Sequence, residues 1–204
     1  MVNLDIDNLP IIKNQISILR KIPFDKFPKL KELGAISERI YGCWNFNSYN
    51  NVDNDLPYFK EKAYLRATLN EFVSISEILK EKYIDISIEK TNIPLLHFFK
   101  ELRVTNFHIK TFVPNTIKST VLLTNKEEVT NENFELELFV IENCDIELFF
   151  SNFNYIKYYS SVEFEQIVNW VNKNQYIWGI NYIIDFALNQ YCELINKTVT
   201  NTSD

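Results

Sequence analysis

Hydrophobic residues recur at helical spacing in residues 57–83, "PYFKEKAYLRATLNEFVSISEILKEKY". Positions three or four apart lie on one face of an α-helix, because the helix turns once every ~3.6 residues. Pro57 suits the first turn of such a helix. The pattern predicts one long helix that packs against a core along a single side. Its apolar stripe consists of Leu65, Leu69, Phe72, Val73 and Leu79.

Two shorter segments near the beginning of the chain carry the same spacing. Residues 9–21 have apolar residues at helical intervals, and residues 25–42 resemble a second helix that is broken or bent near Gly34. The polar, Asn-rich stretch 45–55 that follows is predicted to be a loop.

Two further helices are predicted in the second half of the chain. Residues 94–113 form a bounded element, because Pro94 suits a first turn and Pro114 cannot continue a helix. Residues 161–196 carry helical spacing throughout. Gly179 lies within this segment, where it permits either a close helix contact or a kink.

The periodicity changes between these two helices. Residues 116–123 and 134–141 resemble strands. The second strand alternates apolar with acidic residues, which is typical of a strand with one buried face. We expect an antiparallel hairpin that packs on the helices, since an isolated hairpin is marginally stable. The alternating residues are Phe134, Glu135, Leu136, Glu137, Leu138 and Val140.

These elements together predict a mainly α protein, an antiparallel helical bundle with a small antiparallel β-hairpin insertion. We expect residues 1–204 to form a single domain. Residues 1–56 would supply N-terminal helices and a loop, and residues 57–196 the bundle, with the hairpin inserted near 115–142. The chain has only 3 glycines and 6 prolines, too few for the many turns of an all-β protein.

Charge and sequence motifs exclude several classes of function. The formal net charge is −6, so a nucleic acid could be bound only through a local patch. Glycine-rich nucleotide loops and the G-x-S-x-G motif of serine hydrolases are absent from the sequence. The three cysteines are far apart, and we expect them to be buried, reduced thiols.

The expected location is the cytoplasm. The first twenty residues carry Asp5 and Asp7 and lack the continuous apolar run of a signal peptide. The sequence contains no run of about 18 apolar residues, so we expect no membrane partner.

The candidate chemistry lies in residues 95–114, "LLHFFKELRVTNFHIKTFVP", which hold both histidines. On a helix, Arg103 and His108 point about 140° apart and cannot converge within one chain. Two antiparallel copies across a two-fold axis could bring the Arg of one copy to the His of the other. The helix is apolar nearly all round, as expected if a second copy covers one side. The core stripe also contains Asn106, which would need a buried hydrogen-bond partner.

Such a pair supports cleavage of RNA. Histidine titrates near neutral pH and can take the proton of a 2′-hydroxyl or give one to the leaving 5′ oxygen. Arginine is always charged and binds phosphate oxygens with two N–H groups. The products would carry 2′,3′-cyclic phosphates, no metal or other cofactor would be needed, and DNA would be spared.

The stretch "FFKELRVTNFHIK" resembles the R-x4–6-H motif of HEPN domains, with Arg103 at the arginine and His108 at the histidine of the motif. The preceding "YLRATLNEFVSISEIL" is similar to the helix beside it in several HEPN proteins. The resemblance implies a dimeric, metal-independent endoribonuclease, of the kind found among toxins and antiviral effectors. Other members of the family are catalytically silent binding modules. An antitoxin or regulatory protein is a further expected partner, since an always-active ribonuclease would harm its host.

Neighbouring polar residues are candidates for orienting the pair. The position after the motif arginine is often polar in the family but is Val104 here, so Thr105 or Asn106 would supply that polarity. On the helix 57–83, Asn70 and Glu71, together with Arg66, could act across the helix pair. The alternative for these residues is an ordinary solvated helix face.

Two other interpretations of the histidines stay open at this point. Arg103 and His108 are otherwise a surface arginine and a hydrogen-bonded structural histidine. A metal site built from His97, Glu101 and His108 would span about three turns, too far for one ion, so no metal is predicted.

Overall fold

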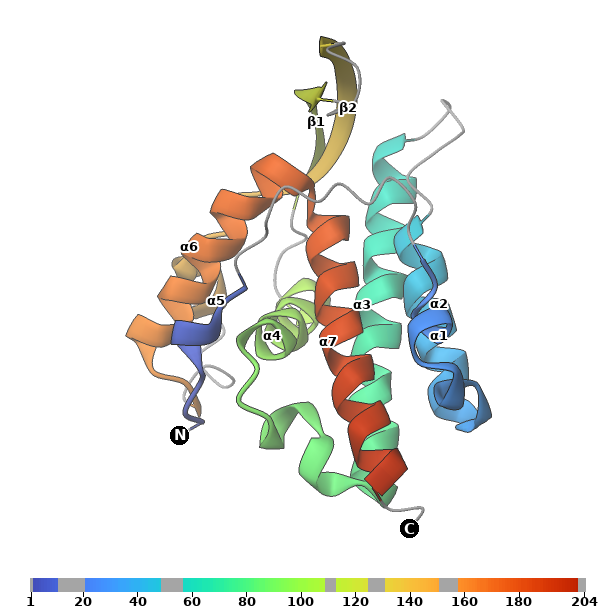
Figure 1. Ribbon diagram of the computed structural model, residues 1–204. Helices are drawn as coiled ribbons and strands as arrows, with labels where there is room; N and C mark the ends of the chain where they lie inside the picture. Colours follow the sequence, from blue (N-terminus) through green and yellow to red (C-terminus); the bar gives the residue numbers. More distant parts are fainter. Residues whose placement is uncertain are drawn as a thin grey trace.

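The computed structural model describes residues 2–10, 21–48, 57–108, 113–124, 131–150 and 158–201. It is mainly helical, with one two-stranded antiparallel sheet (Figure 1). Short 3-10 turns join several of the helices: η1 (Ile6–Asn8), η2 (Pro28–Glu32), η3 (Ile84–Ile86) and η4 (Ile88–Lys90). The larger elements are α1 (Pro23–Lys26), α2 (Ala35–Ser48), α3 (Pro57–Lys82), α4 (Pro94–His108), β1 (Val113–Thr124), β2 (Asn131–Glu142), α5 (Ile146–Phe150), α6 (Ser161–Trp178) and α7 (Ile180–Asn201).

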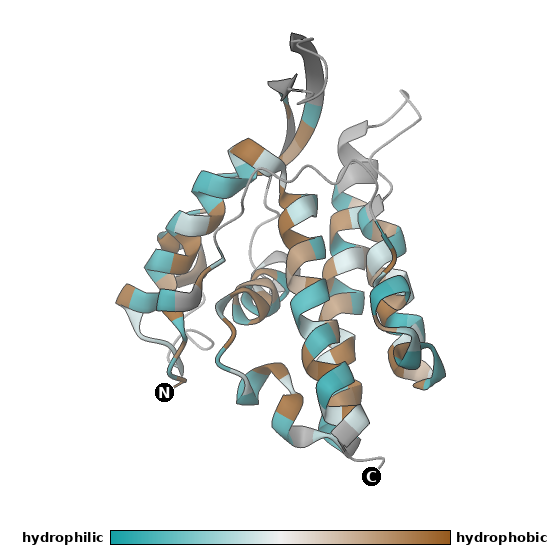
Figure 2. Ribbon diagram, in the orientation of Figure 1, coloured by the Kyte–Doolittle hydropathy of each residue, from teal (hydrophilic) through white to brown (hydrophobic). Residues whose placement is uncertain are grey.

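The long helix predicted from the apolar stripe is α3, and all five residues of that stripe are buried. Helices α2, α3 and α7 run side by side, and α4 lies across them (Figure 1). Hydrophobic and hydrophilic residues are interspersed within the turns of the long helices (Figure 2). Each helix therefore buries one side and leaves the other to solvent.

Aromatic rings connect the helices across the core. Phe72 of α3 meets Phe99 of α4 edge to face, with ring centroids 5.7 Å apart. The adjacent Phe98 packs on Phe149 of α5 at 5.5 Å, and Phe149 packs on Phe164 of α6 at 5.1 Å. Each such pair adds about 0.5–1.5 kcal/mol to the stabilisation from burial alone. This ladder fixes α4 between α3 and α6.

The helix that begins at Pro94 does not extend to residue 113 as its bounding prolines predict. Helix α4 is described over Pro94–His108, and strand β1 begins at Val113 and includes Pro114, opposite Ile141 of β2. Proline fits there because Ile141 directs its own N–H and C=O to the side chain of Gln175 in α6 (Ile141 N–Gln175 Oε1 2.8 Å, Gln175 Nε2–Ile141 O 3.1 Å). The missing N–H of Pro114 therefore costs no ladder hydrogen bond.

The predicted hairpin is confirmed and is longer than expected. Strands β1 and β2 pair from Val113↔Glu142 to Thr124↔Asn131. At its base, Leu138, Phe139 and Val140 are buried, in the part of β2 that contacts α6 and α7. The hairpin thus packs on the helices, as its marginal stability alone requires.

The segment predicted as one last helix is two. Gly179 has φ of +80°, a left-handed conformation that favours glycine, and its N–H donates to the carbonyl of Gln175 (2.8 Å). Helix α6 ends there, and α7 leaves in a new direction (Figure 1). Among the described helices, none is both long and apolar enough to cross a membrane.

The N-terminal predictions are met in part. The break at Gly34 is confirmed, because its φ of +56° separates α1 and η2 from α2. Residues 45–48 were expected in a loop but complete α2, and the rest of 45–55 that lies before α3 is outside the described residues. Buried Asn47 explains the polar end of α2, since it donates to Asn181 O (2.8 Å) and Asp185 Oδ1 (2.7 Å) of α7. Most of the predicted helix 9–21 also lies outside the described residues.

The three cysteines form no disulfide and are buried, as expected. Burial raises the pKa of Cys144 to about 12, which makes this thiol a poor nucleophile.

Candidate functional site

Helices α3 and α4 bring Arg103 beside Asn70. Nη2 of Arg103 lies 3.4 Å from Oδ1 of Asn70, and both side chains are half-buried. At 3.4 Å the hydrogen bond is long and therefore weak. The sequence offered Asn70, with Arg66 and Glu71, as a residue that could orient Arg103 or His108 across the helix pair. The Phe72–Phe99 pair packs the same two helices together nearby. A role for Asn70 in orienting a catalytic arginine stays a prediction.

His108 is the last residue of α4. Its side chain and that of Asn106 lie outside the described part of the chain. The backbone of α4 is helical from Pro94 to His108, so Arg103 and His108 leave the helix about 140° apart and about 7.5 Å apart along its axis. Within one chain this geometry does not favour convergence on a single phosphate.

The surface of α4 that suggested a second copy is largely covered by the chain itself. Leu96 is fully buried and Val104 is nearly so. These two residues therefore give no argument for a dimer interface. Positions 103 and 108 are about 140° apart on an ideal helix, and this angle still favours a composite site.

The hydrogen bonds and ion pair described for Glu71 are made with α2, not with Arg103. The carboxylate of Glu71 binds Arg39 of α2, with Nη1 3.0 Å from Oε2 and 3.2 Å from Oε1. Gly42 allows this approach, because a Cβ there would lie only 3.1 Å from Cγ of Glu71. Glu71 links α2 to α3.

Thr105 is buried, and its hydroxyl donates to the carbonyl of Glu101 on the same helix (2.8 Å). Its side chain is therefore engaged within α4. Arg66, one turn before Asn70, is exposed and has no hydrogen bond or ion pair with any residue the structure describes.

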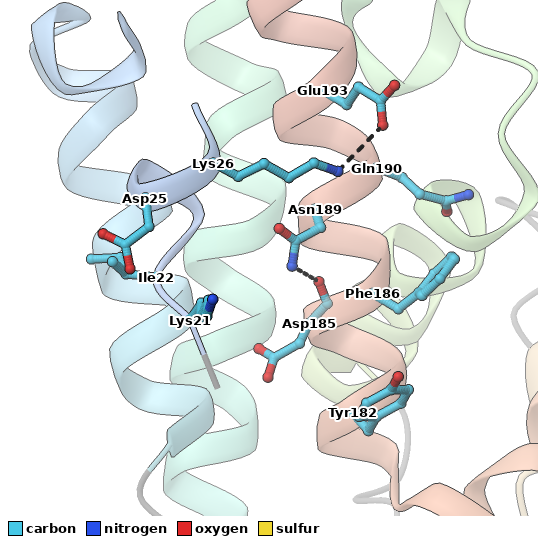
Figure 3. Close-up of a pocket in the computed structure, with 10 residues that line it drawn as sticks. All are labelled: Lys21, Ile22, Asp25, Lys26, Tyr182, Asp185, Phe186, Asn189, Gln190 and Glu193. Atoms are coloured by element: carbon cyan, nitrogen blue, oxygen red, sulfur yellow. Dashed lines mark hydrogen bonds and ion pairs between the residues drawn. The ribbon is translucent and has the colours of Figure 1, made fainter. Parts of the chain in front are cut away.

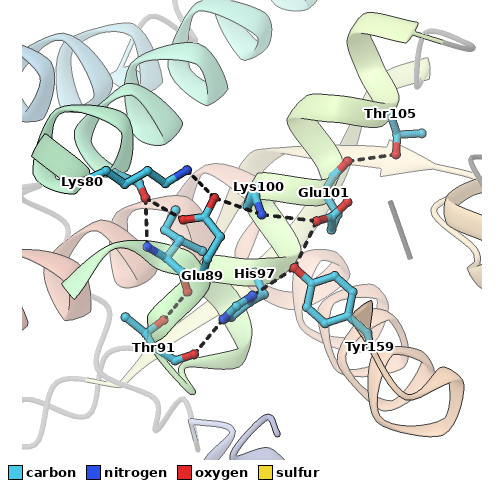
Figure 4. Close-up of polar contacts among 10 residues, drawn as sticks. Lys80, Glu89, Thr91, His97, Lys100, Glu101, Thr105 and Tyr159 are labelled. Carbon is cyan, nitrogen blue, oxygen red and sulfur yellow. Dashed lines mark hydrogen bonds and ion pairs between the residues drawn. The ribbon is translucent and has the colours of Figure 1, made fainter. Parts of the chain in front are cut away.

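A row of hydrogen-bonded, buried side chains on α4 was not predicted from the sequence (Figure 4). Nε2 of His97 lies 2.9 Å from the carbonyl oxygen of Thr91, and Nδ1 lies 3.0 Å from Oη of Tyr159. The same Tyr159 oxygen lies 3.0 Å from Oε1 of Glu101. We call His97, Tyr159 and Glu101 the buried triad.

The sequence held one signal of this triad. His97 and Glu101 are four residues apart on a helix that is apolar nearly all round, so both needed buried partners. Tyr159 is 62 residues after His97, and the sequence offered no pattern that singled it out.

Burial governs the ionisation of the triad. It lowers the pKa of His97 to about 4, and it raises the pKa of Glu101 and of Tyr159. Glu89, beside the triad, behaves differently. Burial favours its neutral form, but hydrogen bonds from Lys80 and its own backbone, together with the charge of Lys100, outweigh this and lower the pKa of Glu89 to about 2.

The metal alternative finds no support in the part of the chain that the structure describes. There, no three His, Cys, Asp or Glu side chains are grouped to hold an ion. Both ring nitrogens of His97 already have hydrogen-bond partners.

A surface pocket of about 640 Å³ lies between the N-terminal segment and α7 (Figure 3). Across it Lys26 reaches Glu193 (3.9 Å), and Asn189 bonds the backbone of Asp185. Neither Arg103 nor Asn70 lines it. The pocket is thus separate from the candidate pair.

Comparison of the chain with protein-family models, curated proteins and solved structures finds no match.

Proposed function

We propose that this protein is a HEPN-type, metal-independent endoribonuclease. Arg103 would bind the phosphate, and His108 would transfer protons to and from the ribose oxygens. The observation that supports the proposal best is the placement of Arg103. It lies on a helix packed against α3, in contact with Asn70, and five residues before the histidine that ends the helix.

The chemistry follows from the two side chains. A histidine takes the 2′-hydroxyl proton as the 2′ oxygen attacks phosphorus, and a protonated histidine gives a proton to the departing 5′ oxygen. The Arg103 guanidinium stabilises the negative charge that builds on the phosphate oxygens. The product is a 2′,3′-cyclic phosphate and a free 5′-hydroxyl.

We propose that the site is completed by a second copy of the chain. Arg103 and His108 diverge around α4, so an antiparallel partner helix offers the simplest way to bring an arginine and a histidine together. A homodimer would then contain two such sites.

RNA would approach locally, since the chain as a whole is acidic. Arg66 supports an approach along α3. It is exposed, one turn from Asn70, and without a partner among the described residues, so its charge is available for a neighbouring phosphate.

A toxin or anti-phage effector held by an antitoxin or regulatory partner is the cellular role that the resemblance favours. This cellular role can be tested by expressing the wild type, His108→Ala and Arg103→Ala in parallel. Lys29→Ala is the control for the loss of a positive charge elsewhere on the surface. We expect growth arrest and cleaved total RNA with the wild type and with Lys29→Ala only. Equal growth and intact RNA in all four strains would count against an intrinsically active ribonuclease.

One observation favours the second candidate, a catalytically silent HEPN-type binding module. The polar residue expected beside the motif arginine is not supplied by Val104, and the hydroxyl of Thr105 is engaged by the backbone of its own helix. Such a module would keep its partner when His108 is replaced by alanine. Co-purification of the same partner with wild type and variant, without RNA cleavage by either, would establish it.

A further inference from the structure

The buried triad ties α4 to two other parts of the fold. Through His97 it holds the carbonyl of Thr91, which follows η4, and through Tyr159 it holds the segment that leads into α6 (Figure 4). Its side chains are almost inaccessible to water, with 0% of His97, 3% of Glu101 and 6% of Tyr159 exposed. Each hydrogen bond of the triad must therefore use a hydrogen carried by His97, Tyr159 or Glu101, and not one from water.

The number of protons can be counted from the contacts. A backbone carbonyl only accepts, so Nε2 of His97 carries a hydrogen and donates it to Thr91. Two contacts remain, between Nδ1 and Oη and between Oη and Oε1 of Glu101, and each needs one hydrogen. The Tyr159 hydroxyl supplies one. A neutral imidazole with an ionised carboxylate would leave the other contact without a hydrogen.

The second hydrogen can reside at either end of the chain. On His97 it makes an imidazolium that faces a Glu101 carboxylate through the phenol. On Glu101 it makes a carboxylic acid that donates to Tyr159, whose hydroxyl then donates to Nδ1. The first arrangement buries two separated charges, and the second buries none. Because unpaired buried charges are far more costly than hydrogen-bonded neutral groups, the neutral arrangement is favoured.

We infer that Glu101 is a carboxylic acid in the folded protein and that the triad is an uncharged, proton-bearing clamp on α4. The inference does not depend on the proposed ribonuclease activity. In the clamp, Glu101 donates to Tyr159, Tyr159 to His97, and His97 to Thr91. Each of the three contacts of the triad then has one hydrogen.

The charges around the triad fit this assignment. Lys100 is the cation closest to Glu101, at 3.9 Å from Oε1, but it lies closer to Glu89 of η4, at 3.2 Å. Lys80 of α3 also binds Glu89, at 2.7 Å. Glu89 therefore receives both ammonium groups. Acidic groups on the other adjoining segments, Asp5 and Glu163, line a separate surface hollow around Asn92.

The clamp should make the stability of the α4 packing depend on pH. When Glu101 loses its proton, Tyr159 donates to the carboxylate, and Nδ1 of His97 loses its donor. Because the pKa of Glu101 is raised in the fold, the stabilisation is complete at low pH and is lost as the pH rises through that folded value. The hold on α4 should loosen as the pH rises through the folded pKa of Glu101.

Glu101→Gln tests the inference, because the amide N–H replaces the acid O–H as the donor to Tyr159. We expect the melting temperature of the variant to lie within about 2 °C of the wild-type value at neutral pH. As the pH rises further, the melting temperature of the variant should fall less than that of the wild type. If the triad were an ion pair, the variant would leave a buried imidazolium uncompensated, and melting would fall by roughly 10 °C. That fall would overturn the assignment. Glu163→Gln, outside the triad, is the matched control and should follow the wild type.

A second measurement does not require a triad variant to fold. The chain has only two histidines, so nitrogen NMR of His108→Ala reports on His97 alone. We expect a neutral imidazole with its hydrogen on Nε2 at pH 7. A doubly protonated ring at that pH would contradict the neutral clamp.

Discussion

Asn70 of α3 accepts a hydrogen bond from Nη2 of Arg103 of α4 across a distance of 3.4 Å. The contact joins the two helices whose sequences carry the HEPN resemblance. It also turns the guanidinium of Arg103 toward α3, on the side where Arg66 is exposed. The proposed phosphate site is therefore expected where these two helices meet.

Asn70→Ala should reduce RNA cleavage by a few-fold, because a long hydrogen bond contributes about 0.5–1 kcal/mol. The loss should appear in kcat more than in KM if Asn70 orients Arg103 for the transition state. Ser74→Ala, one turn further along α3, is the control and should cleave as the wild type does. Equal kinetics for Asn70→Ala and wild type would remove Asn70 from the site.

Mixing two inactive variants tests whether the site is shared between copies. An equal mixture of Arg103→Ala and His108→Ala would contain about half mixed dimers, each with one intact site of two, so about a quarter of wild-type activity should return. The gain should appear only after the subunits exchange. A mixture that stays inactive after exchange would show that both residues act within one chain, or that no dimer forms.

Tyr159→Phe should destabilise the protein, because it removes the hydroxyl that joins two buried polar groups. Leaving such groups unsatisfied costs about 1–3 kcal/mol, which lowers the melting temperature of a chain of this size by roughly 2–12 °C. Tyr176→Phe is the matched control, since Tyr176 is exposed on α6. An unchanged melting temperature for Tyr159→Phe would mean that the hydroxyl is not needed by the triad.

Stability should also fall on the acid side. The pKa of His97 is about 4 in the fold, below its ordinary value of about 6.5, so the folded protein resists protonation. The stabilisation is present above pH 6.5 and is lost as the pH falls toward 4, by about 3 kcal/mol at most. Urea unfolding at pH 7 and pH 5 measures the slope. His97→Gln does not titrate and should show a shallower dependence, and an equal slope in both proteins would contradict this assignment.

The elements with strong periodicity were predictable from the sequence. The stripe on α3 marked a face that the structure buries. In the described part of β2, Leu138 and Val140 of the predicted face are buried, and so is Phe139 of the opposite face. Element ends were harder to predict. The fit of Pro114 in β1 depends on Gln175, which lies 61 positions further along the chain and takes the place of a third strand as hydrogen-bond partner of Ile141.

Contacts distant in sequence also explain what was missed at the candidate site. Asn70 and Arg103 were grouped because the spacing of apolar residues placed both on facing helices. Glu71 had the same spacing but turns to Arg39 of α2, a pairing that no local pattern indicates. The triad could not be predicted because Tyr159 reaches it only through the packing of the segment before α6 against α4.

The decisive experiment on the proposed ribonuclease is cleavage of a short RNA by the purified protein. The wild type, in the presence of a metal chelator, is expected to produce 2′,3′-cyclic phosphate ends. His108→Ala should not cleave, and the same oligonucleotide with a 2′-deoxy sugar at the cut site should be spared. Cleavage that survives His108→Ala or the 2′-deoxy substitution would contradict the account, as would the absence of cleavage by a dimeric wild-type protein.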